Sequence, residues 1–180
     1  MENGFRIQFP FRARIFAMLL VASCANEPKP SPPHADRRPG DDTIVKMNRQ
    51  AVKDETREID DYIERHHWNL ERSSTGLRYY IYPTGSGPKS GKGKLVAITY
   101  SVRLLTGEVV AYPGSEKEFE LGRSKVESGL EEGILMMRKG DRAKFIIPSH
   151  LAFGLLGDMN KIPPRATLVY EVELKKISDP

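Results

Sequence analysis

Few side chains in this sequence have the types and spacing that hydrolytic or metal chemistry requires. The four histidines are His34, His66, His67 and His150. They share no spacing with other donors that would assemble a metal site. No serine lies in a nucleophile-elbow pattern, and the glycine- and lysine-rich segment 85–94 lacks P-loop spacing. We therefore predict no metal and no cofactor, and we expect the histidines to lie on a solvated surface.

The remaining candidates are aromatic and aliphatic residues on the inward faces of predicted strands and of one short helix. They are Tyr100, Phe119, Leu130, Phe145, Phe153 and Tyr170. Such a set fits an ordinary hydrophobic core and an apolar binding pocket equally well, because both bury the same kinds of side chain. The pattern alone leaves these two interpretations open.

The elements that would position these residues are mainly β-strands, because apolar residues recur with a period of two from Thr75 onward. The predicted strands cover 77–82, 96–104, 108–112, 119–121, 143–147 and 168–174. A short helix is expected at 126–137. The two-residue turn at 106–107 is too short for a parallel crossover, so the sheet should be antiparallel. We therefore predict an α+β domain at 75–180, with one helix covering the sheet.

A charged amphipathic helix is predicted at 44–68, within an N-terminal region that spans 44–74. Asp41, Asp42 and Thr43 offer capping oxygens at its start. Its apolar stripe is narrow and consists of Val45, Val52, Ile59, Tyr62 and Ile63. The stripe is compatible with packing against the chain's own domain, with pairing to a second copy as a dimer, and with marginal helicity. The sequence leaves these alternatives open.

The first 23 residues have the features of a targeting segment, because basic residues precede an apolar run too short to span a bilayer. The run ends at Cys24, the only cysteine, in a pattern that resembles a bacterial lipobox. A lipidated Cys24 would anchor the chain, and the proline-rich residues 24–43 would form a disordered tether. We expect a cell-envelope location facing the periplasm. Ala25 after the cysteine indicates the outer membrane, by resemblance to Gram-negative sorting.

Charge and composition exclude one class of partner. The formal net charge is +4, and hydrophobic residues make up 39% of the chain. Binding to nucleic acid depends on many basic contacts, often with interleaved aromatic residues, and no such stripe is present. We therefore predict no nucleic-acid partner.

Four segments decide between core and pocket, because together they closely resemble the C-terminal half of FKBP-type peptidyl-prolyl isomerases. These segments are 130–134, 140–145, 152–154 and 162–174, and the resemblance extends over 75–177. Within the family, the lipobox, tether and preceding helix resemble gliding-motility-associated lipoproteins of Bacteroidetes. The resemblance implies a five- to six-stranded antiparallel sheet wrapped around a short helix, with a proline-binding pocket between them.

The resemblance also implies roles for individual residues. The residues matched to the catalytic pocket are Tyr100, Leu130, Phe153, Ile162 and Tyr170, and those matched to its substrate-binding rim are Val110, Phe119, Val126 and Glu127. At Glu127 the backbone N–H would receive a substrate carbonyl, which gives the side chain little weight. Ala111 replaces a common aspartate, Val110 a common aromatic residue, and Phe153 a common tyrosine. These departures predict a shallower pocket with fewer polar groups.

The implied activity is cis/trans isomerisation of X–Pro bonds in proline-containing polypeptides, in support of the folding of exported proteins. Two other functions remain open at this stage. The same pocket would serve a non-catalytic binder of proline-containing segments or a chaperone subunit. Alternatively, the chain would be a scaffold lipoprotein of an envelope complex of the gliding type, with the 44–68 helix as its partner surface.

Overall fold

The computed structural model describes residues 41–123 and 126–180; the predicted signal peptide, Cys24 and the tether up to residue 40 lie outside the described residues. The elements are α1 (Asp41–Arg65), β1 (Glu71–Arg72), β2 (Arg78–Tyr82), β3 (Leu95–Leu104), β4 (Val109–Glu120), α2 (Ser128–Met136), β5 (Arg142–Ile147), the 3₁₀ helix η1 (Ser149–Leu151) and β6 (Leu168–Ser178). Neither α1 nor α2 is long and apolar enough to cross a bilayer.

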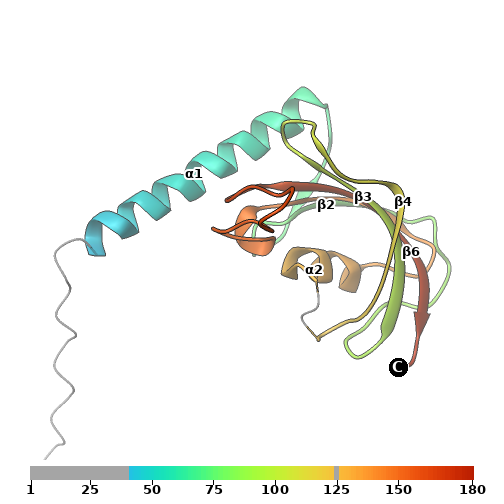
Figure 1. Ribbon diagram of the computed structural model, residues 1–180. Helices are drawn as coiled ribbons and strands as arrows, with labels where there is room; N and C mark the ends of the chain where they lie inside the picture. Colours follow the sequence, from blue (N-terminus) through green and yellow to red (C-terminus); the bar gives the residue numbers. More distant parts are fainter. Residues whose placement is uncertain (1–40, 124–125) are drawn as a thin grey trace, which may run out of the picture. The chain divides into compact units, whose positions relative to one another are not determined.

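The strands form one six-stranded antiparallel sheet in the order β1-β2-β5-β6-β3-β4, which confirms the predicted fold class. Figure 1 shows the sheet curving around α2. The face toward α2 carries the main core, and the alternating residues of β6 predicted to point inward are all buried there. They are Leu168, Tyr170, Val172 and Leu174. The other face is largely polar, as expected of a sheet with one wet side.

β4 differs from the prediction, because the two short strands expected at 108–112 and 119–121 belong to one continuous strand. The register steps from Tyr100 opposite Ser115 to Val102 opposite Ala111, so β4 carries extra residues at this point. Gly114, with φ +88°, lies among them. A bulge of this kind interrupts the period of two, which made one strand look like two. The short β1 was not predicted.

Helix α2 is shorter than the predicted 126–137. Glu127 has an extended backbone (φ −57°, ψ 134°), as does Met137 (φ −87°, ψ 161°), so the helical residues lie between them. The predicted inward face is confirmed, since Leu130, Ile134 and Met137 are fully buried.

Two glycines one turn apart let α2 lie unusually close to the sheet. A Cβ atom on Gly133 would lie 2.5 Å from Cζ of Phe145, and one on Gly129 would lie 2.5 Å from Cγ2 of Ile147. Both distances are far below van der Waals contact, so any side chain at either position would push the helix away from β5.

The predicted stripe on α1 packs on its own domain over its C-terminal half. Ile59 and Tyr62 are buried against Ile146 and Val169, which point to the face of the sheet away from α2. The N-terminal half of the stripe is not covered within the described structure, since Val45 and Val52 are each 52% exposed. Packing on the chain's own domain is therefore confirmed for one half of the helix.

The ends of α1 differ from the predicted 44–68. The three residues expected as caps, 41–43, lie inside the first helical turn. At the other end, His67 adopts a left-handed backbone (φ 54°), and the N–H of Trp68 donates back to the carbonyl of Ile63 at 3.1 Å. This hydrogen-bond pattern closes a helix, so α1 ends at Arg65 although the sequence there remains compatible with a helix.

Polar contacts add to the attachment of α1. The Glu55 carboxylate accepts hydrogen bonds from the backbone N–H and hydroxyl of Ser149, at 2.6 and 3.1 Å, and from the Thr167 hydroxyl at 2.7 Å. Asp60 pairs with the buried Arg78 guanidinium at 2.8 Å. Ser149 and Thr167 are themselves buried, so Glu55 satisfies groups that have little access to water.

Replacing Gly133 by alanine should lower the free energy of unfolding by about 1–3 kcal/mol, because the new methyl group overlaps the Phe145 ring. Urea denaturation measures the change. Gly91→Ala is the matched control, since its Cβ would meet nothing within 4 Å. Equal stability of the Gly133→Ala variant and the wild type would contradict the close approach of α2.

Glu55→Ala should cost about 1–3 kcal/mol of stability, because it leaves the buried donors on Ser149 and Thr167 without their acceptor. Hydrogen exchange should show faster exchange of amides in α1. Glu58→Ala, an exposed acid on the same helix, serves as the control. If both variants exchange at the same rates, Glu55 does not hold the helix to the domain.

Candidate functional site

The residues predicted for the site lie on segments that are far apart in the sequence and join one hydrophobic cluster. The segments are β3, β4, the residues before α2, α2 itself, the 152–167 connection and β6. The cluster contains eight of the nine predicted site residues, namely Tyr100, Val110, Phe119, Val126, Leu130, Phe153, Ile162 and Tyr170. The ninth, Glu127, reaches it through the Tyr170 hydroxyl.

Burial divides these residues into a floor and an edge. Leu130, Phe119, Ile162 and Tyr170 are at most 6% exposed and form the floor. Tyr100, Val110, Val126, Glu127 and Phe153 are half-buried and border it. Phe119, which was predicted at the rim, is thus part of the floor, where it pairs with Val96 of β3. Tyr100 and Phe153 are half-exposed at this edge, so the site is not a sealed interior.

The two tyrosines of the site lie side by side on adjacent strands. The rings of Tyr100 and Tyr170 stack with centroids 6.0 Å apart and planes inclined by 27°. The Tyr170 hydroxyl donates to Oε1 of Glu127 at 2.8 Å. The resemblance gave the Glu127 side chain little weight, but this side chain is only 7% exposed and bonds the buried wall of the site.

Among the described residues, the second carboxylate oxygen of Glu127 has no hydrogen-bond partner. It is the one buried side-chain polar atom without a partner in the part of the chain that the structure describes. Nζ of Lys117 lies 4.0 Å away, which is beyond hydrogen-bonding distance but close enough for attraction between charges. The site therefore contains an acceptor that no described donor satisfies.

Both tyrosine hydroxyls keep their protons at physiological pH. Burial, followed by the Glu127 charge, raises the pKa of Tyr170 far above its usual range. Burial is also the main cause of the raised pKa of Tyr100, again with a contribution from Glu127. Neither group can act as a base, so the arrangement suits binding and hydrogen-bond donation rather than proton abstraction.

Hydrogen-bond donors remain available at the edge. Ala111, which has no polar side chain, lies beside β3 opposite Val102, and within the described residues nothing bonds the Tyr100 hydroxyl. The backbone N–H of Glu127 likewise has no acceptor in that part of the chain. The edge thus carries two donors, on Tyr100 and Glu127, without a partner among the described residues.

The connection between η1 and β6 positions Phe153 and Ile162. Asp158 accepts from the N–H of Ile162 at 2.7 Å, and its own N–H donates to the Ile162 carbonyl at 3.0 Å. The hydrogen bond from Ile162 is the main cause of the lowered pKa of Asp158. Gly157 (φ +71°) allows the turn, because a Cβ there would clash with the Ile162 carbonyl oxygen.

The comparisons with known proteins agree with this geometry. The family model described as FKBP-type peptidyl-prolyl cis-trans isomerase matches residues 87–175. FK506-binding protein 2 of Yarrowia lipolytica is 34% identical over 113 residues, which cover 61% of this chain and 78% of that protein. The chain belongs to the FKBP-type peptidyl-prolyl isomerase family.

Two further relatives of the FKBP type are bacterial. The probable isomerase FkpA of Neisseria meningitidis is 37% identical over 114 residues, 62% of this chain and 41% of that protein. The crystal structure of FkpA from Escherichia coli matches with a TM-score of 0.61 and 30% identity, over 76% of this chain and 64% of that one. This chain therefore spans less than two thirds of either FkpA protein.

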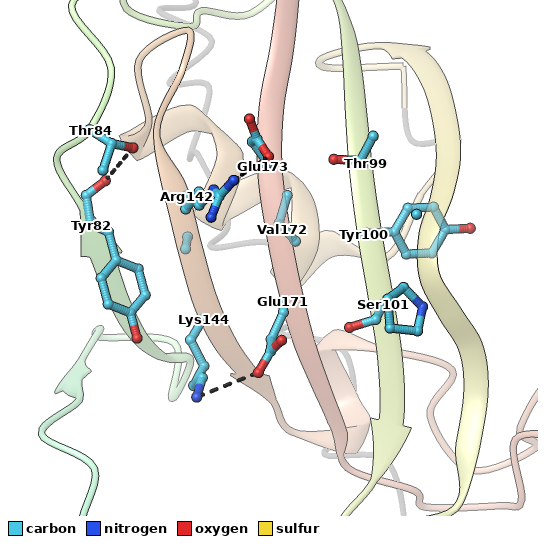
Figure 2. Close-up of a pocket in the computed structure, with 13 residues that line it drawn as sticks. Tyr82, Thr84, Thr99, Tyr100, Ser101, Arg142, Lys144, Glu171, Val172 and Glu173 are labelled. Atoms are coloured by element: carbon cyan, nitrogen blue, oxygen red, sulfur yellow. Dashed lines mark hydrogen bonds and ion pairs between the residues drawn. The ribbon is translucent and has the colours of Figure 1, made fainter.

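A hollow of about 560 Å³ lies on the opposite face of the sheet from α2, away from the candidate site. Figure 2 shows its charged side chains on β5 and β6. They form the pairs Lys144–Glu171 at 3.5 Å and Arg142–Glu173 at 3.3 Å. Tyr100 is the single predicted site residue that borders it. Its charged lining offers no dry surface for a prolyl ring.

Sequence reasoning missed two residues that contribute to the candidate site. Asp158 gave no signal beyond its place in an irregular segment. Lys117 could have been found, because it precedes Phe119 by two residues on the same strand and so shares its inward face. A charged residue at an inward position indicates an acidic partner nearby, and that partner is Glu127.

Proposed function

We propose that this chain is a peptidyl-prolyl cis/trans isomerase that acts on proline-containing segments of unfolded polypeptides. The observation that carries the proposal is the half-exposed aromatic edge of Tyr100 and Phe153 above the buried floor of Leu130 and Tyr170. The prolyl ring would lie against the floor. The N–H of Glu127, which has no acceptor among the described residues, would receive a substrate carbonyl, as expected from the family resemblance.

An apolar site is sufficient for this reaction, because no covalent bond breaks. Rotation about the X–Pro bond interrupts amide resonance, which sets a barrier of about 18–20 kcal/mol. The planar amide is more dipolar than the twisted one, so transfer from water to a dry surface penalises the ground state more than the transition state. A thousandfold acceleration requires about 4 kcal/mol, which this difference and two hydrogen bonds could supply.

A second candidate is a binder of proline-containing segments without turnover. Val110 and Ala111 favour it, because they give the β4 side of the site neither an aromatic wall nor a polar group. In that case the chain would retain unfolded proline-containing polypeptides without changing their rate of isomerisation.

A proline-limited refolding assay separates the two candidates. The wild-type protein should accelerate the slow phase, and Phe153→Ala should lower the catalytic efficiency by about tenfold, because it removes an aromatic surface at the edge. Tyr80→Ala, an exposed aromatic residue on β2 outside the site, is the matched control. Binding of the unfolded chain without any acceleration by the wild type would instead support the binder.

We further propose that the chain assists folding of exported proteins in the periplasm, anchored by Cys24 in the outer membrane. The lipobox and the proline-rich residues 24–43 support this location. The uncovered apolar residues of α1, Ile44, Val45, Met47 and Val52, offer a surface for a second copy or for a scaffold partner. A relation to gliding-motility lipoproteins, and a role in such an envelope complex, rests on the arrangement of lipobox, tether and helix.

Cys24→Ala should transfer the protein from the membrane fraction to the soluble fraction, because it removes the only site for acylation. Fractionation of cells followed by immunoblotting measures the distribution. Ser31→Ala, a substitution within the tether, is the control and should remain membrane-bound. A Cys24→Ala variant that stays in the membrane fraction would rule out the lipid anchor.

A further inference from the structure

The Glu127 side chain brings a negative charge into a site that is otherwise apolar and aromatic. Its two oxygens differ in their surroundings. Oε1 accepts a hydrogen bond from the Tyr170 hydroxyl, whereas Oε2 is buried without any hydrogen bond among the described residues. A carboxylate with one unsatisfied oxygen away from water is costly unless a donor or a cation reaches it.

Little within the described chain can supply that donor. The Tyr170 hydroxyl has no second proton to give. Among the described residues Lys117 is the nearest cation, but its Nζ stays 4.0 Å from Oε2, and its side chain is 36% exposed and retains contact with water. A group that arrives with a ligand could take up the free oxygen at a shorter distance than Lys117 does.

We propose that Glu127 is a specificity-determining residue, and that it makes the site prefer X–Pro segments in which X is lysine or arginine. The proposal rests on the isomerase function proposed above and names its substrate class. With the ring of proline on the floor, the residue before it would lie close to the bordering residues, to which Glu127 belongs.

A cationic side chain fits better than a neutral donor for two reasons. The interaction with a carboxylate is charge-assisted, and hydrogen bonds of that kind are about twice as strong as neutral ones. The long aliphatic part of lysine or arginine can also pack along Val110 and Val126 while its charged end reaches the carboxylate. An acidic residue before proline would instead meet repulsion from Glu127.

Lys117 acts as an internal competitor in this arrangement. It attracts the same oxygen from β4, so it lowers the gain that an incoming cation obtains. Substitutions of Glu127 and Lys117 should therefore have opposite effects on the preference. Loss of the Glu127 charge should weaken the preference for a cationic residue, and loss of the Lys117 charge should strengthen it.

The test compares tetrapeptides that differ only in the residue before proline, which is lysine, leucine or glutamate. Wild-type protein should isomerise the lysine peptide with the highest kcat/KM and the glutamate peptide with the lowest. Glu127→Gln keeps the shape and an acceptor for Tyr170, and should lower the lysine-to-leucine ratio at least about fivefold, or roughly 1 kcal/mol. Lys117→Met should raise the same ratio.

Glu118→Gln provides the matched control, because it removes an exposed acid next to Lys117 that lies outside the site. Its ratio should equal that of the wild type. A purely structural role for Glu127 would change unfolding midpoints and rates for all peptides alike, and would leave the ratio unchanged. An unchanged ratio in Glu127→Gln, or in Lys117→Met if the former does not fold, overturns the proposal.

The same peptides separate this proposal from the proposed function. If the wild type accelerates none of them, the isomerase function fails, and the dissociation constants of the three peptides then decide the preference. Tighter binding of the lysine peptide, lost in Glu127→Gln, supports the role of Glu127 even without turnover. Equal affinities for all three peptides overturn it.

Discussion

The contact of α2 with β5 is the constraint on which the rest of the domain depends. Gly129 and Gly133 carry no side chains, so the helix axis can approach Ile147 and Phe145 closely. This separation sets the position of Leu130 in the floor and lets Glu127, which directly precedes the helix, reach Tyr170. Side chains at these two positions would widen the spacing between α2 and β5, and the Glu127 carboxylate would move away from Tyr170.

A polar pair, Tyr170 of the floor and Glu127 of the edge, lies within an otherwise apolar site. Most of the site is an uncharged surface, which suits a reaction that is favoured when the amide is transferred out of water. The hydrogen bond between Tyr170 and Glu127 adds a fixed direction and a charge to that surface. Because the carboxylate is held by an aromatic residue of the central sheet, its position is set by the fold and not by a mobile loop.

The sequence predicted most of the sheet, because period-two patterns persist along β3, β5 and β6. It did not predict the continuity of β4, since the bulge near Gly114 interrupts the alternation. The end of α1 at Arg65 depends on the left-handed backbone of His67, and no glycine or asparagine at this position indicated it in the sequence. The site residues were predicted from motif resemblance. The inward direction of the Glu127 side chain depends on three-dimensional packing, which the spacing of residues along the chain does not show.

The hydrogen bonds of Glu55 have a consequence for how much of the chain makes up the working unit. Ser149 and Thr167 stand at the two ends of the connection that carries Phe153 and Ile162, and one carboxylate from α1 holds both ends. The helix therefore supports the connection that carries part of the site's edge and floor. The smallest fragment with a fully supported rim begins in the middle of α1, well upstream of the region in which the family likeness starts.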